Sequence, residues 1–449
     1  MKQLRAGAGS AVITPPLGAH IAGYFEDRIA VDVHDDLYAH ALVLESGEDV
    51  AAIVECDLIQ LHLEDVNRAR RLAQEQTGIP GRHILIAATH THFGPDVTRG
   101  TNVIHGIDYL DWLPGRIADA VRIAQNRLVA AAVGHAVGQC PEECHNRRYL
   151  MKDGTVVTNP GYLNPEVVAP VGPTDPEVGL VAFVDNDLRP IAVLANYALH
   201  YVGGQHGAVG SLAAGMTPVD VSLTADYFGA FRRSLPRMAG AEFLAIMMNG
   251  CSGDINNIDV FRPAPDYPHP WYQIERVGDV VAAAAYKALR GIRTTDFVRH
   301  AKIAVASDDF EFRRREFTPS EIEAARRFAG GDTPKNLADR AWLESHAILS
   351  LSQQPLAWQT EIQALRVGEV AVVGLPGEIF VELGLEIKSK SPFPRTLTCE
   401  LANDCLGYIP TPQAFENPSY EVYTTPASPA TGPAMVASAL SLLQRLADA

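Results

Sequence analysis

Long apolar runs that stop abruptly at polar residues are the dominant pattern of this chain. The clearest is Ile84–Ala88, which continues into Thr89-His90-Thr91-His92-Phe93-Gly94-Pro95. A short continuous apolar run predicts a buried strand, and the Gly-Pro pair ends it. We therefore expect His90 and His92 where a strand runs out into a loop. Because side chains at i and i+2 of a strand face the same side, both imidazoles can point to one place.

The rest of the chain alternates between strand and helix patterns. Apolar runs predict strands within 33–45, 50–57, 179–200, 243–248 and 367–375. Amphipathic or alanine-rich periodicity predicts helices at 63–78, 108–131, 225–236, 277–291, 318–352, 380–388 and 434–447, the fifth broken at Gly330-Gly331. Segments 140–175 and 403–433 are rich in turn-forming residues and predict long loops. No internal repeat is visible. These elements predict an α/β fold of layered sheets with flanking helices, as a single domain over 1–449.

Composition and charge narrow the range of partners. The chain has 449 residues, 47% hydrophobic and 20% charged, which is typical of a globular protein. A formal net charge of −16 argues against nucleic acid and anionic membranes as partners. The N-terminal segment has no secretory apolar core, and no run reaches the roughly 18 residues of a transmembrane helix. We expect a cytoplasmic protein acting on a small molecule, and homo-oligomerisation is left open.

The cysteines do not indicate a disulfide framework. Six are scattered through a long chain. The spacing Cys140-x-x-x-Cys144-His145 lacks a second ligand pair, so free thiols are expected rather than a zinc site.

Several apolar strands end in groups capable of chemistry. They are followed by His90 and His92, by His200, by the polar turn 249–257, and by Glu378. Strand ends of an open α/β sheet are where ligands bind, so these endings predict a shared cleft. Two histidines and a carboxylate are a ligand set of catalytic zinc that leaves a position for water or substrate. The alternative for a single His-x-His is an ordinary structural pair, and spacing along the sequence does not decide between them.

Six segments in a fixed order resemble one enzyme family, the neutral/alkaline non-lysosomal ceramidases. The segments are Ala88-Thr89-His90-Thr91-His92-Phe93-Gly94-Pro95, Asn146-Arg147, Asn196-Tyr197-Ala198-Leu199-His200, Gly253-Asp254-Ile255-Asn256-Asn257-Ile258, Pro376-Gly377-Glu378 and the pair Tyr408/Tyr420. The resemblance implies the fold of the catalytic domain and hydrolysis of an N-acyl bond. It also implies a Zn²⁺ ion bound by His90, His200, Glu378 and Tyr408. His92, Arg147 and Tyr420 would line the site and polarise the scissile carbonyl.

One departure from the family concerns the nucleophile. The ceramidases carry Gly-Asp-Val-Ser-Pro-Asn-Ile, in which the serine is taken as the nucleophile. Here the segment is one residue shorter, Asn256 stands closest to the serine's place, and Ser252 precedes the Gly-Asp pair. Metal-activated water is then the expected nucleophile. Asp57, His92 or Asp254 could act as base, with His92 first because it adjoins His90.

The second departure concerns the substrate. The chain has no room for the family's C-terminal immunoglobulin-like domain or a lipid-facing insert. Loops 140–175, 201–220 and 403–433 are expected to form the pocket walls, and they contain Arg147, Arg148, His206 and tyrosines but few long aliphatic side chains. A small soluble substrate is expected, with an amide favoured over an ester or lactone. The alternatives are a ceramidase-like lipid amidase and a catalytically silent metal-binding homologue.

Overall fold

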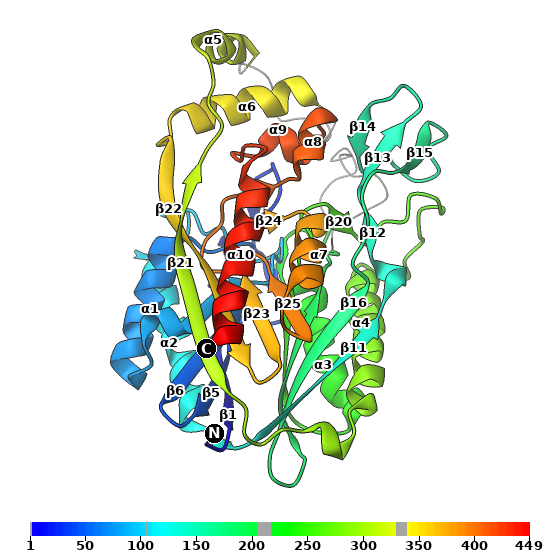
Figure 1. Ribbon diagram of the computed structural model, residues 1–449. Helices are drawn as coiled ribbons and strands as arrows, with labels where there is room; N and C mark the ends of the chain where they lie inside the picture. The colour runs from blue at the N-terminus through cyan, green and yellow to red at the C-terminus, as the bar shows by residue number, and fades with distance from the viewer. Residues whose placement is uncertain (1, 105, 204–216, 329–338) are drawn as a thin grey trace.

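Three mixed sheets form the body of the protein (Figure 1). The computed structural model describes residues 2–104, 106–203, 217–328 and 339–449. The first sheet has the order β10 (Val129–Ala130), β1 (Arg5–Val12), β5 (Tyr38–Ser46), β6 (Asp49–Cys56), β7 (Ile84–Ala88). The second is β11 (Ala132–Gln139), β16 (Glu177–Val184), β17 (Pro190–Tyr197), β19 (Leu244–Asn249). The third is β21 (Ile303–Arg313), β22 (Ala357–Val367), β23 (Val370–Gly374), β25 (Arg395–Cys399).

The same order of elements occurs three times along the chain. Each time, three strands that pair antiparallel are followed by a helix, a parallel edge strand and a second helix, and the first sheet has β10 in addition. The helices are α1 (Leu63–Thr77) and α2 (Tyr109–Asn126), then α3 (Asp226–Ala239) and α4 (Tyr272–Gly291), then α7 (Val381–Lys390) and α10 (Thr431–Asp448). The second helix of each pair packs on the first two strands of its unit. We call these three groups of elements the first, second and third unit.

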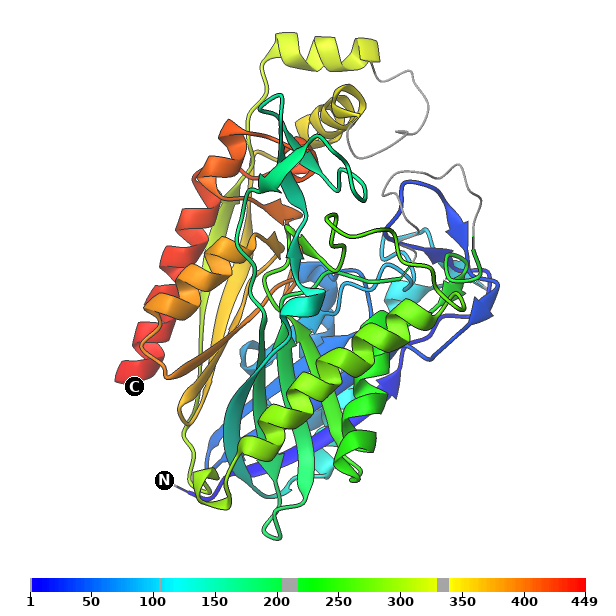
Figure 2. The same ribbon diagram turned by 90° about the vertical axis from the view of Figure 1, so that its right-hand side faces the viewer.

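The sheets meet around a shared core, and the helices cover their outer faces (Figures 1 and 2). Leu42, Val181 and Leu365 come from different sheets and belong to one central cluster. On the outside, apolar side chains of each helix pair pack against the other face of their sheet. Strands buried on both faces need continuous apolar runs, which explains the pattern of the sequence. The predicted α/β class of layered sheets with flanking helices is confirmed.

Each unit carries an insertion after its first strand. The first holds β2 (His20–Ile21), β3 (Arg28–Ile29) and β4 (Asp32–Val33). The second holds β12 (His145–Asn146), β13 (Arg148–Met151), β14 (Val156–Thr158) and β15 (Val167–Pro170). The third holds α5 (Pro319–Phe328) and α6 (Arg340–Ser352), which stand at the top of Figure 1. The predicted break at Gly330-Gly331 lies outside the described residues. The predicted loop at 140–175 is wrong because it forms a small sheet.

The remaining elements are short. They are β8 (Val103–Ile104), β9 (Ile107–Asp108), β18 (Ser222–Leu223), β20 (Ile255–Asn256), β24 (Glu378–Ile379), β26 (Tyr408–Ile409), α8 (Pro412–Glu416) and α9 (Tyr420–Thr424). The predicted loop 403–433 thus contains a strand and two short helices. The predicted helix 108–131 ends earlier, at Asn126, because the chain then turns into β10. Among the described helices, none combines the length and apolarity that crossing a bilayer requires.

Candidate metal centre

His90 lies two residues beyond the end of β7 in a left-handed backbone conformation, with φ of 70°. Its backbone N–H donates to the carbonyl of Leu58, and its Nδ1 lies 2.8 Å from the carbonyl oxygen of Ile59. Because a carbonyl only accepts, the proton of the neutral ring is on Nδ1. The Nε2 lone pair of His90 is therefore free to face the centre of the site.

Two other predicted ligands, His200 and Glu378, lie close to this lone pair of His90. His90 Nε2 lies 3.0 Å from His200 Nε2 and 3.3 Å from Glu378 Oε2, and His200 Nε2 lies 3.9 Å from the same carboxylate oxygen. Ligand atoms at about 2.0–2.1 Å around a tetrahedral zinc are about 3.3 Å apart. The triangle of ligand atoms therefore has the size that a zinc ion requires.

The chemistry of these atoms also fits a cation. With the His90 proton on Nδ1, His90 Nε2 and Glu378 Oε2, 3.3 Å apart, both present lone pairs that a cation between them would bind. Glu378 Oε2 is buried and has no hydrogen-bond partner among the described residues. Burial is the main cause that lowers the pKa of His200 well below its usual value, so its ring is neutral. A neutral imidazole and an ionised carboxylate are the forms that bind a metal.

His92 lies beside this group. Its Nε2 lies 3.2 Å from His90 Nε2, and His90, His92 and His200 form a cluster that could hold a metal ion. The ring stacks on Tyr201 with centroids 3.6 Å apart. Burial is the main cause that holds its pKa well below the usual value. A Cβ on Gly23 would stand 2.5 Å from the ring, so only glycine fits there.

The backbone of His92 is held by a buried arginine that the sequence did not single out. Arg28 donates through Nη2 to the carbonyl of His92 at 2.6 Å, and its guanidinium lies 3.7 Å from the ring centre of Tyr24. It also donates to the carbonyl oxygens of Ala22 and Asp220. Arg28 therefore joins the first insertion to the loop of His92.

Glu378 and Tyr408 are placed by the two-residue strands β24 and β26. The two residues are direct partners in the parallel pairing, so their side chains leave the same side. Burial and the charge of Glu378 raise the pKa of Tyr408 well above its usual value, so the phenol is neutral. Its hydroxyl accepts a hydrogen bond from Arg147 Nη2 at 3.1 Å. The structure thus brings Tyr408 beside Glu378 and ties it to Arg147.

Arg147 is fixed on two sides. Its Nε donates to Glu421 Oε1 at 2.8 Å, and its Nη2 donates to the carbonyl of Gly253 at 2.8 Å. Burial would raise the pKa of Glu421, but the guanidinium groups of Arg147 and Arg148 hold it below its usual value. Glu421 follows the predicted Tyr420 directly and was missed, because a glutamate at the start of a helix looks like a solvated residue.

Tyr420 begins α9 and lies beside Tyr408, with ring centroids 5.7 Å apart and planes at 72°. Burial, then the charge of Glu378, raises the pKa of its hydroxyl. It is half-buried and faces Phe25 on its other side, at 6.4 Å. Tyr420 therefore stands at the edge of the candidate metal centre rather than at its floor.

Asp254 and Asn256 make structural hydrogen bonds. Asp254 accepts from the Val381 N–H at 2.9 Å and from Asn146 Nδ2 at 2.8 Å, so it caps α7 from another segment. Burial raises the pKa of Asp254 to about 6. Asn256 donates to Asn159 at 2.6 Å and accepts from the Ile258 N–H at 3.0 Å. Neither side chain is hydrogen-bonded to His90, His92 or His200.

Asp57 and Ser252, which were also considered from the sequence, are both hydrogen-bonded to other side chains. Asp57 binds Arg232 through both oxygens, each at 2.7 Å. Ser252 donates through Oγ to Glu400 Oε1 at 2.6 Å. Glu400 follows β25 and accepts from the Ile379 N–H at 2.8 Å, which supports the segment carrying Glu378. It follows an apolar strand, so the signal that found Glu378 could also have found Glu400.

The predicted pocket walls are partly described. Segment 140–175 brings Arg147 to the site, and segment 403–433 brings Tyr408 and Tyr420. Within 201–220, residues 204–216, including His206, lie outside the described residues.

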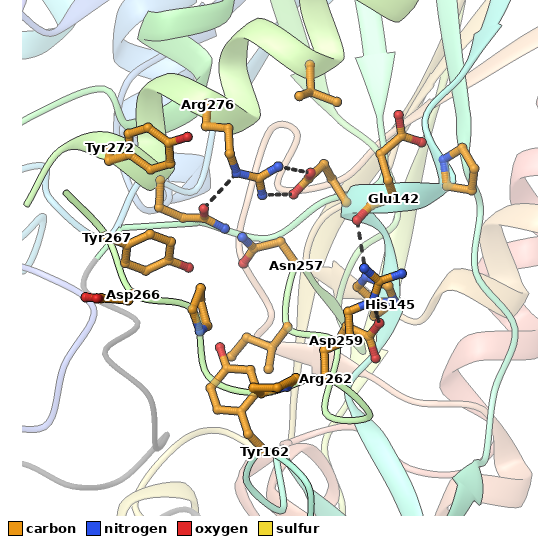
Figure 3. Close-up of a pocket in the computed structure, with 17 residues that line it drawn as sticks. Glu142, His145, Tyr162, Asn257, Asp259, Arg262, Asp266, Tyr267, Tyr272 and Arg276 are labelled. Carbon is orange, nitrogen blue, oxygen red and sulfur yellow. Dashed lines mark hydrogen bonds and ion pairs between the residues drawn. The ribbon is translucent and has the colours of Figure 1, made fainter. Parts of the chain in front are cut away.

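A separate cavity of about 720 Å³ lies beside β12, which contributes His145 to its lining (Figure 3). Tyr267 and Tyr272 lie on one side, and His145 and Glu142 on another. None of the predicted site residues lines it. Arg276 binds Glu143 through two nitrogens at 2.6 and 2.8 Å, so this ion pair is already satisfied.

Comparison with known proteins supports the fold. No protein-family model matches the chain, and no curated protein matches it significantly. Among solved structures, the neutral ceramidase from Pseudomonas aeruginosa matches with a TM-score of 0.72 and 18% identity, over 99% of this chain and 75% of that one. A structure described as ceramidase complexed with C2 matches with a TM-score of 0.74 and 17% identity, over 100% of this chain and 76% of that one. The chain therefore has a neutral-ceramidase-like fold.

Proposed function

We propose, from the premise that this chain has a neutral-ceramidase-like fold, that it is a zinc-dependent hydrolase of N-acyl amide bonds in a small soluble substrate. The observation that supports this most directly is the triangle of His90 Nε2, His200 Nε2 and Glu378 Oε2, with edges of 3.0, 3.3 and 3.9 Å. A Zn²⁺ ion held there would activate water and polarise the scissile carbonyl.

The remaining residues act on the substrate through their own atoms. We assign His92 as the base, because its neutral ring can take a proton at Nε2. Arg147 is fixed by Glu421 and Gly253, so its positive charge is preorganised beside Tyr408. A charge that is fixed before reaction stabilises a developing oxyanion without reorganisation cost. We assign this role to Arg147, with the Tyr420 hydroxyl as the second donor.

The first test is metal content together with activity. We expect the purified protein to contain one zinc per chain, and His90→Ala and His200→Ala to lose both zinc and activity. His135→Ala is the matched control, since this histidine lies on β11 with its side chain one-third exposed. A chain that binds no metal, with full activity in His90→Ala, would refute the proposal.

His92 requires its own measurement. His92→Ala should keep zinc and lose kcat by at least about 10²-fold, the usual contribution of a general base. Loss of zinc from this variant would instead make His92 a metal ligand. The distinction matters because its Nε2 lies as close to His90 Nε2 as a ligand would.

A substrate panel separates the alternatives. We expect short N-acyl amides to be hydrolysed faster than matched esters and lactones. Activity confined to N-acyl sphingoid lipids in detergent would favour a ceramidase-like lipid amidase. Zinc binding without activity on any of these compounds would favour a silent metal-binding homologue.

A further inference from the structure

Aromatic side chains continue from the candidate metal centre toward the surface. Tyr420 lies edge-on to Tyr408 on one side and to Phe25 on the other, with ring centroids 5.7 and 6.4 Å apart. Phe25 in turn lies edge-on to Trp342 at 5.7 Å, and Trp342 stacks on His346 at 3.7 Å. We call Phe25, Trp342 and Tyr420 the aromatic rim.

Two members of the rim connect to the metal centre. Tyr420 contacts Tyr408, the pairing partner of Glu378. Phe25 follows Tyr24, whose ring centre lies 6.3 Å from that of His92. The segment carrying Tyr24 and Phe25 therefore spans the site from the histidines to α9, and the rim borders the metal centre instead of lying elsewhere on the surface.

Part of the apolar surface of the rim is exposed to solvent. Phe25 is 44% exposed, although it already contacts two other rings. Trp342 and Tyr420 are half-buried. They come from the first insertion, from α6 and from α9, so three distant segments each place a ring here. A large apolar side chain exposed beside a polar centre is typical of ligand sites, in which apolar walls hold a substrate and a few polar groups orient it.

The geometry favours a ring as the occupant. The three contacts along the rim have interplanar angles of 72°, 85° and 74°, which are edge-to-face arrangements. A further aromatic ring can extend this series, because the edge of one ring is attracted to the face of the next. An aliphatic chain gains only from burial and has no such preference.

We propose that the aromatic rim binds a planar ring carried by the substrate, so that the preferred substrates are N-acyl amides with an aryl group close to the scissile bond. This proposal rests on the proposed function, and it defines the substrate class of the same site. Each ring contact is expected to favour the aryl substrate by about 2- to 12-fold.

The test compares two substrates of similar size, the N-phenylacetyl and N-cyclohexylacetyl amides of one amine. We expect kcat/KM of the native enzyme to favour the phenyl compound by about tenfold or more. Phe25→Leu and Trp342→Leu keep apolar side chains but remove the rings, so each should lower the ratio by about 2- to 12-fold. Phe261→Leu and Trp112→Leu are matched controls, because both residues are exposed rings outside the rim, and they should leave the ratio unchanged. Equal rates for the two substrates in the native enzyme would overturn the proposal.

A binding measurement separates failure of the rim from failure of the proposed function. Phenylacetamide and cyclohexylacetamide are titrated against the native protein and against Phe25→Leu, with tryptophan fluorescence as the readout. Preferential binding of phenylacetamide that Phe25→Leu abolishes supports the rim even if no amide is hydrolysed. Amide hydrolysis without any phenyl preference in rate or binding leaves the proposed function standing and refutes the rim.

Discussion

At the scale of single residues, the side chains of the candidate centre are held in place by their surroundings. His90 has its proton directed to Nδ1 by the Ile59 carbonyl, and the buried Glu378 Oε2 has no hydrogen-bond partner among the described residues. Arg147 binds Glu421, Gly253 and Tyr408 at once. Fixed protonation and fixed orientation are what make a site preorganised.

Arg147→Lys tests whether the guanidinium geometry matters. A lysine has one nitrogen and cannot reproduce the bonds that Arg147 makes through Nε and Nη2. We expect kcat/KM to fall by about tenfold or more, which corresponds to about 1.4 kcal/mol, the order of one charge-assisted hydrogen bond.

The control for this prediction is Arg148→Lys. Arg148 is equally buried and donates to Ser419 and to the Asn417 carbonyl, without contacting the predicted metal ligands. It should lose stability but keep kcat/KM. Native kcat/KM in Arg147→Lys would remove Arg147 from the proposed mechanism.

The sequence predicted residues that follow apolar strands and missed those that depend on tertiary burial. His90, His200 and Glu378 could be found because each stands just beyond a buried strand. Arg28 and Glu421 could not, because an isolated arginine or glutamate looks the same in a sequence whether it is solvated or buried. Only the folded chain shows that Arg28 binds the His92 carbonyl. The metal-ligand roles themselves stay predictions.

At the scale of elements, each of the three units supplies one of the converging side chains. His90 follows β7, His200 follows β17 and Glu378 follows β23. The strands could be predicted because their apolar runs are long. The short pairs β12·β20 and β24·β26 could not, since two-residue strands have no periodicity. The β24·β26 pair is nonetheless what places Glu378 beside Tyr408.

Gly253→Ala tests this placement. The N–H of Gly253 donates to the Ile379 carbonyl at 2.9 Å, and a Cβ there would lie 2.5 Å from the backbone oxygen of Glu378. The methyl group should displace Glu378 and weaken zinc binding by about 10- to 100-fold, as loss of a ligand's supporting contacts usually does. Zinc affinity is measured by chelator competition. Gly291→Ala, where a Cβ meets open space, should bind zinc normally.

Asp254, which caps α7, predicts how the free energy of unfolding depends on pH. Its folded pKa is about 6 against 3.8 in a free aspartate, so the folded state binds the proton more tightly. The stabilisation is complete below about pH 4 and is lost as the pH rises through 6. By linkage, this amounts to about 3 kcal/mol.

Asp254→Asn removes this titration. The free energy of unfolding of the native protein relative to the variant should therefore decrease by about 3 kcal/mol between pH 4 and pH 7, as measured by urea unfolding. Asp266→Asn changes an exposed aspartate and should show no such trend. A pH-independent difference for Asp254→Asn would show that its carboxyl group does not favour the proton in the folded state.

At the scale of the whole molecule, the recurring order of elements explains why the candidate centre lies where it does. The three sheets pack around one cluster that includes Leu42, Val181 and Leu365. Their parallel strand pairs end close together, so side chains far apart in the sequence meet there. The repetition was invisible in the sequence, because insertions of different kinds follow the first strand of each unit and because different apolar residues fill equivalent strands equally well.

The shared core predicts that the chain unfolds as one unit, in agreement with the expected single domain. Unfolding any one sheet would expose the part of the central cluster that the other two sheets contribute, so a partly unfolded state is unfavourable. Urea unfolding followed by far-UV circular dichroism and by tryptophan fluorescence should give coincident transitions. The tryptophans Trp112, Trp271 and Trp358 report on the first, second and third unit. Two separated transitions would show independent domains.

Removal of zinc should lower the free energy of unfolding, and the protein should still unfold in a single transition. The proposed ligands come from all three units, so a bound ion stabilises the folded state as a whole and does not bind the unfolded chain in the same geometry. At a free zinc concentration about 100 times Kd, this stabilisation is about 2.7 kcal/mol. Adding a chelator should lower the unfolding midpoint of the native protein and leave that of His90→Ala unchanged. A chelator effect of equal size in His90→Ala would place the stabilising metal outside the proposed centre.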